Sequence, residues 1–146
     1  MRRVLAPTGW VALSVYSAIE RTPAAYAFVR ALDRNLGPDA SKIKRAEHIF
    51  QPSDLGSLMM GAGFEHVDVN TVTKRITFPS VFDYVRFQLI ATPMASLLGG
   101  RSEAEREAAI EGIASDTQLL LAPEMLRDGR LSFPQEAYVA TAGRAG

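Results

Sequence analysis

Residues 3–16 read Arg-Val-Leu-Ala-Pro-Thr-Gly-Trp-Val-Ala-Leu-Ser-Val-Tyr. Within this stretch, Ala6-Pro7-Thr8-Gly9 predicts a turn, because proline fixes φ at the second position and glycine closes the turn. The run from Val11 to Tyr16 is too continuously apolar for a strand with one exposed face, so we expect both of its faces to be covered. The stretch therefore predicts a turn that leads into a buried strand.

The rest of the chain predicts two more strands and four main helices. Proline, glycine and capping residues set the helix boundaries. The first helix begins at Thr22-Pro23 and ends at Gly37-Pro38, and the second begins at Gln51-Pro52 and ends at Gly61 and Gly63. The third begins at Pro79-Ser80, and the fourth begins at Ser102 with Glu105 and ends at Pro123. Strands are expected over His66–Phe78 and Leu131–Thr141. In the last strand, regular pairing is expected only after Pro134, at Gln135 or Glu136, because proline has no N–H to donate. We expect no regular element from residue 39 to residue 50.

The apolar residues of the strand His66–Phe78 change phase along its length. Val67 and Val69 occupy odd positions, whereas Ile76 and Phe78 occupy even ones. This pattern predicts either a β-bulge or a switch of the face that is covered.

The composition indicates one globular domain without a strong net charge. The chain has 146 residues, 47% hydrophobic and 22% charged, which suffices for one compact core and is short for two domains. Sixteen basic and sixteen acidic residues cancel, which argues against a nucleic acid or an anionic membrane as the partner. We expect the basic run Lys42, Lys44 and Arg45 to be a solvated loop. Residues 1–142 are predicted to form a single α/β domain, and residues 143–146 a flexible tail.

The residue usage argues against several kinds of functional site and against a targeting signal. The chain has no cysteine, which excludes disulfides, thiolate metal sites and cysteine nucleophiles. No histidine has a second histidine or a carboxylate at metal-ligand spacing, so no metal site is expected. The apolar run Trp10–Tyr16 fits a buried strand better than a signal peptide or a membrane span, so we expect a cytoplasmic protein.

Three motifs in sequence order resemble the second half of class I S-adenosylmethionine-dependent methyltransferases. Residues 3–10 are similar to the family's Leu-(Arg/Lys/Ala)-Pro-Gly-Gly segment before its fifth strand, with Thr8 in place of the first glycine. Pro52-Ser53-Asp54-Leu55 followed by Ala62-Gly63-Phe64 resembles the helix, turn and sixth strand that come next. Residues 133–141 resemble the seventh strand, which runs antiparallel between the fifth and sixth. Within the family, the chain is most similar to the small-molecule, ubiquinone- and lipid-type branch.

The resemblance implies a partial Rossmann-like α/β fold with about three strands, the last antiparallel between the other two, and four main helices. It implies S-adenosylmethionine as the cofactor of the parent protein. The family's glycine-rich loop and its cofactor-binding acidic residues correspond to sequence upstream of Met1, so we expect no cofactor-binding residue here and no activity from this chain alone. Gly99-Gly100 follows a helix and lacks the G-x-G spacing of such a loop.

Seven residues are candidates for lining a substrate pocket: Tyr16, Ser17, Glu20, His48, Tyr84, Phe87 and Gln88. The first three follow the C-terminal end of the first strand, where open α/β sheets place their ligands. In the alternative interpretation, Tyr16 caps a core and Glu20 faces solvent.

The other candidates come from a helix and a loop. Tyr84, Phe87 and Gln88 lie on the aromatic third helix, which resembles the family's lid, although an aromatic stripe at helical spacing is also typical of a core. His48 lies between helices and is a candidate general base. Methyl transfer needs mainly proximity and alignment, so the catalytic residues are left unassigned.

Two functions from different classes fit these observations. The first is an S-adenosylmethionine-dependent methyltransferase of which this chain is the substrate-side half. The second is a non-catalytic α/β interaction module or small-molecule-binding module derived from that fold. The expected partners are a small-molecule or lipid-like substrate and either a second copy or a missing N-terminal half, since the first strand is predicted to leave one edge bare.

Overall fold

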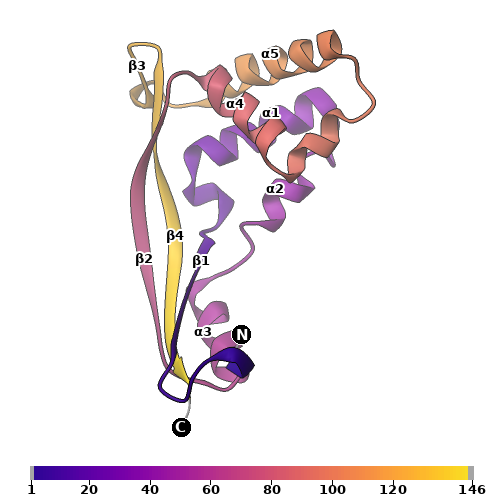
Figure 1. Ribbon diagram of the computed structural model, residues 1–146. Helices are drawn as coiled ribbons and strands as arrows, with labels where there is room; N and C mark the ends of the chain where they lie inside the picture. The colour runs from indigo at the N-terminus through magenta and orange to yellow at the C-terminus, as the bar shows by residue number, and fades with distance from the viewer. Residues whose placement is uncertain (1, 145–146) are drawn as a thin grey trace.

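The computed structural model describes residues 2–144 and consists of one β-sheet with helices packed against it (Figure 1). The strands are β1 (Trp10–Tyr16), β2 (Phe64–Phe78), β3 (Leu126–Arg127) and β4 (Arg130–Arg144). The α-helices are α1 (Pro23–Leu36), α2 (Lys42–Ala46), α3 (Pro52–Gly61), α4 (Val81–Ala91) and α5 (Glu103–Leu120), and the 3-10 helices are η1 (Arg2–Val4), η2 (Ile19–Arg21), η3 (Pro93–Leu98) and η4 (Pro123–Met125). Helices α1, α4 and α5 gather at one end of the sheet, and α3 lies near the other end (Figure 1).

The sheet has the order β1-β4-β2, with β4 antiparallel to both of its neighbours. This confirms the predicted mixed α/β class in which the last long strand lies antiparallel between the other two. The short strand β3 was not predicted. It pairs with the start of β4 through a tight turn at Asp128-Gly129, whose φ angles of 50° and 76° suit the Asp-Gly hairpin signal.

Strand β4 is longer at both ends than the sequence predicts. Pairing begins at Arg130 and continues through Pro134, which lies opposite Arg75 of β2, so the expectation that pairing starts after Pro134 is wrong. Because β1 pairs only with residues 137–143, β4 has a single paired neighbour at the proline among the described strands, and such edge-like positions tolerate it. Gly143 and Arg144, assigned to the flexible tail, instead pair within the sheet, while residues 145–146 lie outside the described chain.

The two ends of the sheet are covered on opposite faces. Along β4, Leu131 and Phe133 join the core cluster of α1, α4 and α5, whereas Ala140 joins the cluster around α3. Odd and even residues of a strand face opposite sides, so the covered face changes along the strand. Strand β2 follows the same rule: Val69 packs toward α3 and Ile76 toward the helical cluster, with an unbroken register from residue 68 to residue 78. The predicted switch of covered face is confirmed, and a bulge lies upstream, between Glu65 and Asp68.

The helix boundaries follow their predicted signals, with one difference in α1. Gly37 ends α1 with a φ of 104°, and the capping box of Ser102 and Glu105 opens α5. Thr22 precedes α1 but does not cap it with its side chain; the Thr22 hydroxyl instead accepts a hydrogen bond of 3.4 Å from Gln135 Nε2. Its partner thus comes from the sheet.

The segment predicted to lack regular structure contains the short helix α2. Asp33 of α1 fastens its start, because the Asp33 carboxylate accepts hydrogen bonds of 2.9 and 2.8 Å from the backbone N–H and hydroxyl of Ser41. Arg45 completes the network by donating to the Ser41 hydroxyl at 2.8 Å. These contacts join polar side chains, so hydrophobic periodicity alone does not reveal them.

Strand β1 is covered on one face only among the described residues. Val11, Leu13 and Val15 pack against the cluster around α3, while Trp10 and Tyr16 on the opposite face are exposed. The expectation of two covered faces is therefore not met within residues 2–144. The outer edge of β1 pairs with no other described strand.

Candidate functional site

A small cavity lies where the C-terminal end of β1, helix α2, helix α4 and the adjoining parts of β2 and β4 come together. Its volume is about 160 Å³. Ten residues line it: Tyr16, Ala25, Lys44, Ile76, Phe78, Tyr84, Phe87, Gln88, Phe133 and Gln135. Four of the sequence-predicted residues, from two distant segments, thus meet at one place: Tyr16, Tyr84, Phe87 and Gln88. We call this space the aromatic cavity.

Aromatic rings form the walls of this cavity. The ring of Phe78 lies 5.2 Å from that of Tyr84, 5.9 Å from that of Phe87 and 6.5 Å from that of Phe133, measured between centroids. Such edge-to-face and stacked pairs hold one another in place. Burial raises the pKa of Tyr84, so its hydroxyl keeps its proton at neutral pH. Tyr84 is therefore an uncharged part of the wall.

Gln88 supplies a polar group that has no partner. Its side chain is only 8% exposed, and its Oε1 atom is buried without a hydrogen bond among the described residues. Buried amides are nearly always hydrogen-bonded, and an unsatisfied buried acceptor costs about 1–3 kcal/mol. The Oε1 atom is itself closed to solvent, so a partner from outside would reach it only after the side chain moves.

Lys44 is a cavity residue that the sequence analysis missed. The basic run to which it belongs was expected to be a solvated loop, yet Lys44 is only 7% exposed. Its ammonium group lies 2.7 Å from Glu47 and 5.2 Å from the centre of the Tyr16 ring, which is a cation–π contact. Because Asp33 and Ser41 fix the start of α2, the helix carries Lys44 inward. In the sequence, the only sign of this ion pair is that Glu47 follows Lys44 by three residues.

His48 supports the cavity from behind and is not one of its lining residues. Its ring stacks on Tyr16 with centroids 5.1 Å apart, and its Nδ1 lies 2.7 Å from the Ser17 carbonyl. A carbonyl only accepts hydrogen bonds, so Nδ1 carries the proton and Nε2 is left as a buried acceptor without a partner. Burial lowers the pKa of His48, which favours this neutral form.

Ser17 and Glu20 are near the cavity but do not line it. Ser17 is buried beneath His48, and its backbone carbonyl fixes the imidazole. Glu20 is exposed in η2, as the alternative interpretation expected. Next to it, Arg21 pairs with Glu136 of β4, and this hydrogen-bonded ion pair lowers the pKa of the Glu136 carboxyl.

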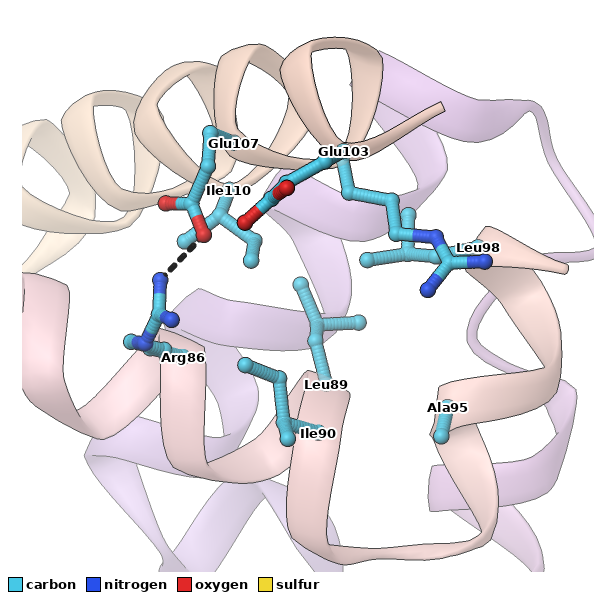
Figure 2. A pocket seen from close by; sticks show the side chains of 9 residues that line it. Arg86, Leu89, Ile90, Ala95, Leu98, Glu103, Glu107 and Ile110 are labelled. Carbon is cyan, nitrogen blue, oxygen red and sulfur yellow. Dashed lines mark hydrogen bonds and ion pairs between the residues drawn. The ribbon is translucent and has the colours of Figure 1, made fainter. Parts of the chain in front are cut away.

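A wider depression lies on the other side of α4, between α4, η3 and α5 (Figure 2). Its volume is about 430 Å³, with Leu89, Leu98 and Ile110 in its floor. Arg86 reaches across it to pair with Glu107 (Figure 2). No candidate residue from the sequence lies there. We call this depression the α4–α5 groove.

Metal binding within residues 2–144 would need a cluster of histidine or acidic side chains, and cofactor binding would need a glycine-rich loop after a strand. No group of three histidine or acidic side chains is arranged to hold a metal ion in this part of the chain. Gly99-Gly100 connects η3 to α5, and the Ser102 side chain already accepts a hydrogen bond from an N–H of the first turn of α5. The residues at this loop do not fit the nucleotide cradle of S-adenosylmethionine, which follows a strand. No described helix is long and apolar enough to cross a membrane.

Comparison with known proteins gave a structural likeness and no sequence match. No family model matches the chain, and no curated protein does. Among solved structures, the chain is similar to a protein described as a "putative methyltransferase" from Bacillus halodurans C-125, with 19% identity and a TM-score of 0.44. The match covers 99% of this chain and 55% of that protein, so the chain spans about half of that structure's length.

Proposed function

We propose that this chain is the substrate-binding part of an S-adenosylmethionine-dependent methyltransferase and that the aromatic cavity holds a small-molecule substrate. The motifs at residues 3–10, 52–64 and 133–141 support the proposal through their resemblance to that family. The strand order, with β4 antiparallel between β1 and β2, is the order that the resemblance implies.

The convergence of predicted residues on one cavity carries the proposal. Tyr16 ends strand β1, and Tyr84, Phe87 and Gln88 come from α4, yet all four line the same space. Ligands of α/β sheets bind beyond the carboxyl ends of the strands, which is where Tyr16 lies.

The chain's own residues bind and orient the substrate in this proposal. The buried rings of Tyr84 and Phe133 give the cavity an apolar floor against which a ligand ring can be held in position. Lys44 and Gln88 fix its orientation. The methyl donor is held outside the described residues, because Gly99-Gly100 does not form its site.

The proposal is tested by methyl transfer with the cofactor-binding part supplied. The DNA upstream of Met1 is read for an in-frame glycine-rich strand–turn–helix, and the extended chain is incubated with tritium-labelled S-adenosylmethionine and a panel of small aromatic compounds. Label is expected in an aromatic product. Phe87→Ala should lower kcat/KM by about tenfold or more through lost alignment. Phe87 is 50% exposed, so the variant should fold, and Ile90→Ala, 52% exposed in the α4–α5 groove, is the matched control.

Two outcomes would contradict the proposal that this chain binds the substrate while another part of the protein binds the cofactor. Saturable binding of S-adenosylhomocysteine by the 146-residue chain alone, measured by calorimetry, would place a cofactor site in residues that we have not assigned. An extended chain that binds the cofactor but methylates nothing on the panel would contradict the placement of the substrate.

A non-catalytic ligand-binding module is the second candidate. It is favoured by the fact that residues of this chain alone form the walls of the aromatic cavity. A stop codon and a ribosome-binding site directly before Met1, with ligand binding but no methyl transfer, would support it.

The outer edge of β1 is where we propose that the cofactor-binding part joins the chain. Residues 10–16 contain no charged residue and no proline, the features that usually protect an edge strand. A second copy pairing through the same edge is the competing arrangement. Analytical ultracentrifugation separates them: the 146-residue chain should self-associate through the free edge, and Ala12→Lys, on the exposed face of β1, should abolish this. A monodisperse monomer for the unsubstituted chain would count against self-association.

A further inference from the structure

The outer edge of β2 is the longer of the two open edges of the described sheet. β2 pairs with β4 on one side and with no described strand on the other. No helix lies on its outer side in Figure 1. The strand has 15 residues, against seven in β1, and its register on β4 is regular from Asp68 to Phe78. Such an edge offers backbone N–H and C=O groups to another strand.

The charges along this edge are separated by sign. Glu65 and Asp68 lie in the first half of β2, Lys74 and Arg75 lie in the second half, and all four side chains are exposed. Charged residues usually protect an edge strand, because pairing brings like charges together. Here they oppose a parallel copy of β2. An antiparallel copy instead brings the acidic half of one strand beside the basic half of the other.

One antiparallel register places opposite charges directly across from each other. With Thr71 on the two-fold axis, Asp68 of each copy lies opposite Lys74 of the other copy. In the same register, Val69 lies opposite Thr73 and Thr71 lies opposite itself, so β-branched residues that favour strands face one another. The bulge between Glu65 and Asp68 lies outside this central segment.

Asp68 and Lys74 are both available for such a contact. Neither residue forms an ion pair within the described chain. The Asp68 carboxylate accepts a hydrogen bond from Asn70 of the same strand, which leaves further lone pairs for a lysine. Both residues are on the face of β2 that also carries Ile76, because even-numbered residues share one face from residue 68 onward.

The helices leave room for this pairing. Helix α3 covers one face of the sheet at the acidic end of β2, and α1, α4 and α5 cover the other face at the basic end. A two-fold axis normal to the sheet exchanges the two ends but keeps each face on its own side. Helix α3 of one copy then comes beside the open face that carries Arg75 and Thr77 in the other copy, and the larger helical cluster comes beside the open face that carries Asp68 and Asn70.

From these observations we infer that two copies of the chain pair antiparallel through β2, about a two-fold axis at Thr71, and form one continuous sheet of order β1-β4-β2-β2-β4-β1. Main-chain hydrogen bonds supply the affinity, and the two Asp68–Lys74 pairs fix the register. The outer edges of β1 lie at the two ends of this sheet, where the cofactor-binding part is proposed to join. The interface itself requires neither a substrate nor a methyl donor.

The test is analytical ultracentrifugation of the full chain with Ala12→Lys, which closes the β1 edge and leaves that of β2. This parent should be a dimer with a Kd of about 1–100 µM, since two paired strands make a small interface. Adding Asp68→Lys or Lys74→Glu places like charges opposite each other and should raise the Kd by about tenfold or more. Glu111→Lys, on the exposed side of α5, changes the net charge as Asp68→Lys does and should leave the Kd unchanged.

Mixing the two weakened variants separates an interface contact from a folding defect. In an equimolar mixture of the Asp68→Lys chain and the Lys74→Glu chain, opposite charges again face each other across the two-fold axis. The mixture should therefore form a heterodimer with a Kd within about threefold of that of the parent. Damage to the fold of either chain would not be repaired by mixing.

Cysteine substitution in the parent tests the register, because the chain has no cysteine of its own. Thr71 and Thr73 are both exposed and share one face of β2. The two Cα atoms at residue 71 should lie about 4.5–5.5 Å apart, within the range of a disulfide. Those at residue 73 should lie more than about 13 Å apart, because Thr73 is opposite Val69. Under mild oxidation, only Thr71→Cys should give a cross-linked dimer.

Three results would overturn the inference. The first is a monodisperse monomer of the Ala12→Lys parent at about 1 mM, ten times the weakest expected Kd. The second is a mixture of the two charge variants that stays as weakly associated as each variant alone. The third is equal cross-linking of Thr71→Cys and Thr73→Cys. None of these results bears on methyl transfer, which the extended chain tests separately.

Discussion

The two faces of helix α4 border two very different hollows. Tyr84, Phe87 and Gln88 face the aromatic cavity, whereas Leu89 and Arg86 face the α4–α5 groove. The groove is the larger, about 430 Å³ against about 160 Å³, but its rim is exposed and Arg86 is paired with Glu107. The cavity holds a buried lysine and an unpaired buried amide. The comparison teaches that buried polar groups, and not volume, set the two hollows beside this helix apart.

The largest expected difference between the two faces concerns packing. Phe133→Ala removes a buried ring that contacts Phe78 and Tyr84, and it should lower the free energy of unfolding by about 3–5 kcal/mol. Ile90→Ala, in the exposed wall of the groove, should change it by no more than about 0.5 kcal/mol. Urea denaturation followed by circular dichroism measures both. Equal losses would show that the cavity wall is no more rigid than the groove.

A smaller difference, with opposite signs, is expected for the polar residues of α4. Gln88→Leu removes an unpaired buried acceptor and should raise the free energy of unfolding by about 1 kcal/mol. Arg86→Met breaks a partly exposed ion pair and should lower it by less than about 1 kcal/mol. Thermal unfolding of the two variants tests the contrast. A destabilised Gln88→Leu would mean that Gln88 has a structural partner.

The pH dependence of stability tests the role of His48, which lies behind the cavity. Burial lowers the pKa of His48 in the folded protein, so the unfolded chain takes up this proton at a higher pH than the folded chain does. The stability from neutral His48 is therefore complete above the unfolded pKa of about 6.5 and is lost as the pH falls from there through the lower folded pKa. Urea denaturation at several pH values should show this loss in the unsubstituted protein and a reduced loss in His48→Gln.

An exposed residue that does not titrate provides the matched control. Ile49→Ala, next to His48 in the chain, should keep the pH dependence of the unsubstituted protein, since Ile49 is 66% exposed. The same slope in His48→Gln as in Ile49→Ala would refute the assignment of a neutral, buried His48.

The sequence predicted those parts of the fold that depend on residues close together in the chain. It predicted the Pro23 and Gly37 boundaries of α1 and the capping box at Ser102, because each of these depends on neighbouring residues. The sequence also predicted the switch of covered face in β2, because each half of the strand packs on a different helical layer and the apolar residues change phase accordingly. Pro134 was misjudged because its tolerance depends on how far β1 extends alongside β4.

The site was predicted only in part for the same reason. Tyr16 was found from its place at a strand end and Gln88 from its helix, since both follow from local position. Lys44 was missed because its burial depends on Asp33, in another helix, which fixes the start of α2. His48 was found, but its role as a support for Tyr16 comes from a stacking contact that no spacing shows.

The most direct measurement is a crystal structure of the chain with the tightest-binding small aromatic compound of the panel bound. The account predicts ligand density inside the aromatic cavity, with the ligand ring packed against Phe78 and Phe87. Density in the α4–α5 groove, or an empty aromatic cavity at saturating ligand, would contradict the assignment of this cavity as the substrate site.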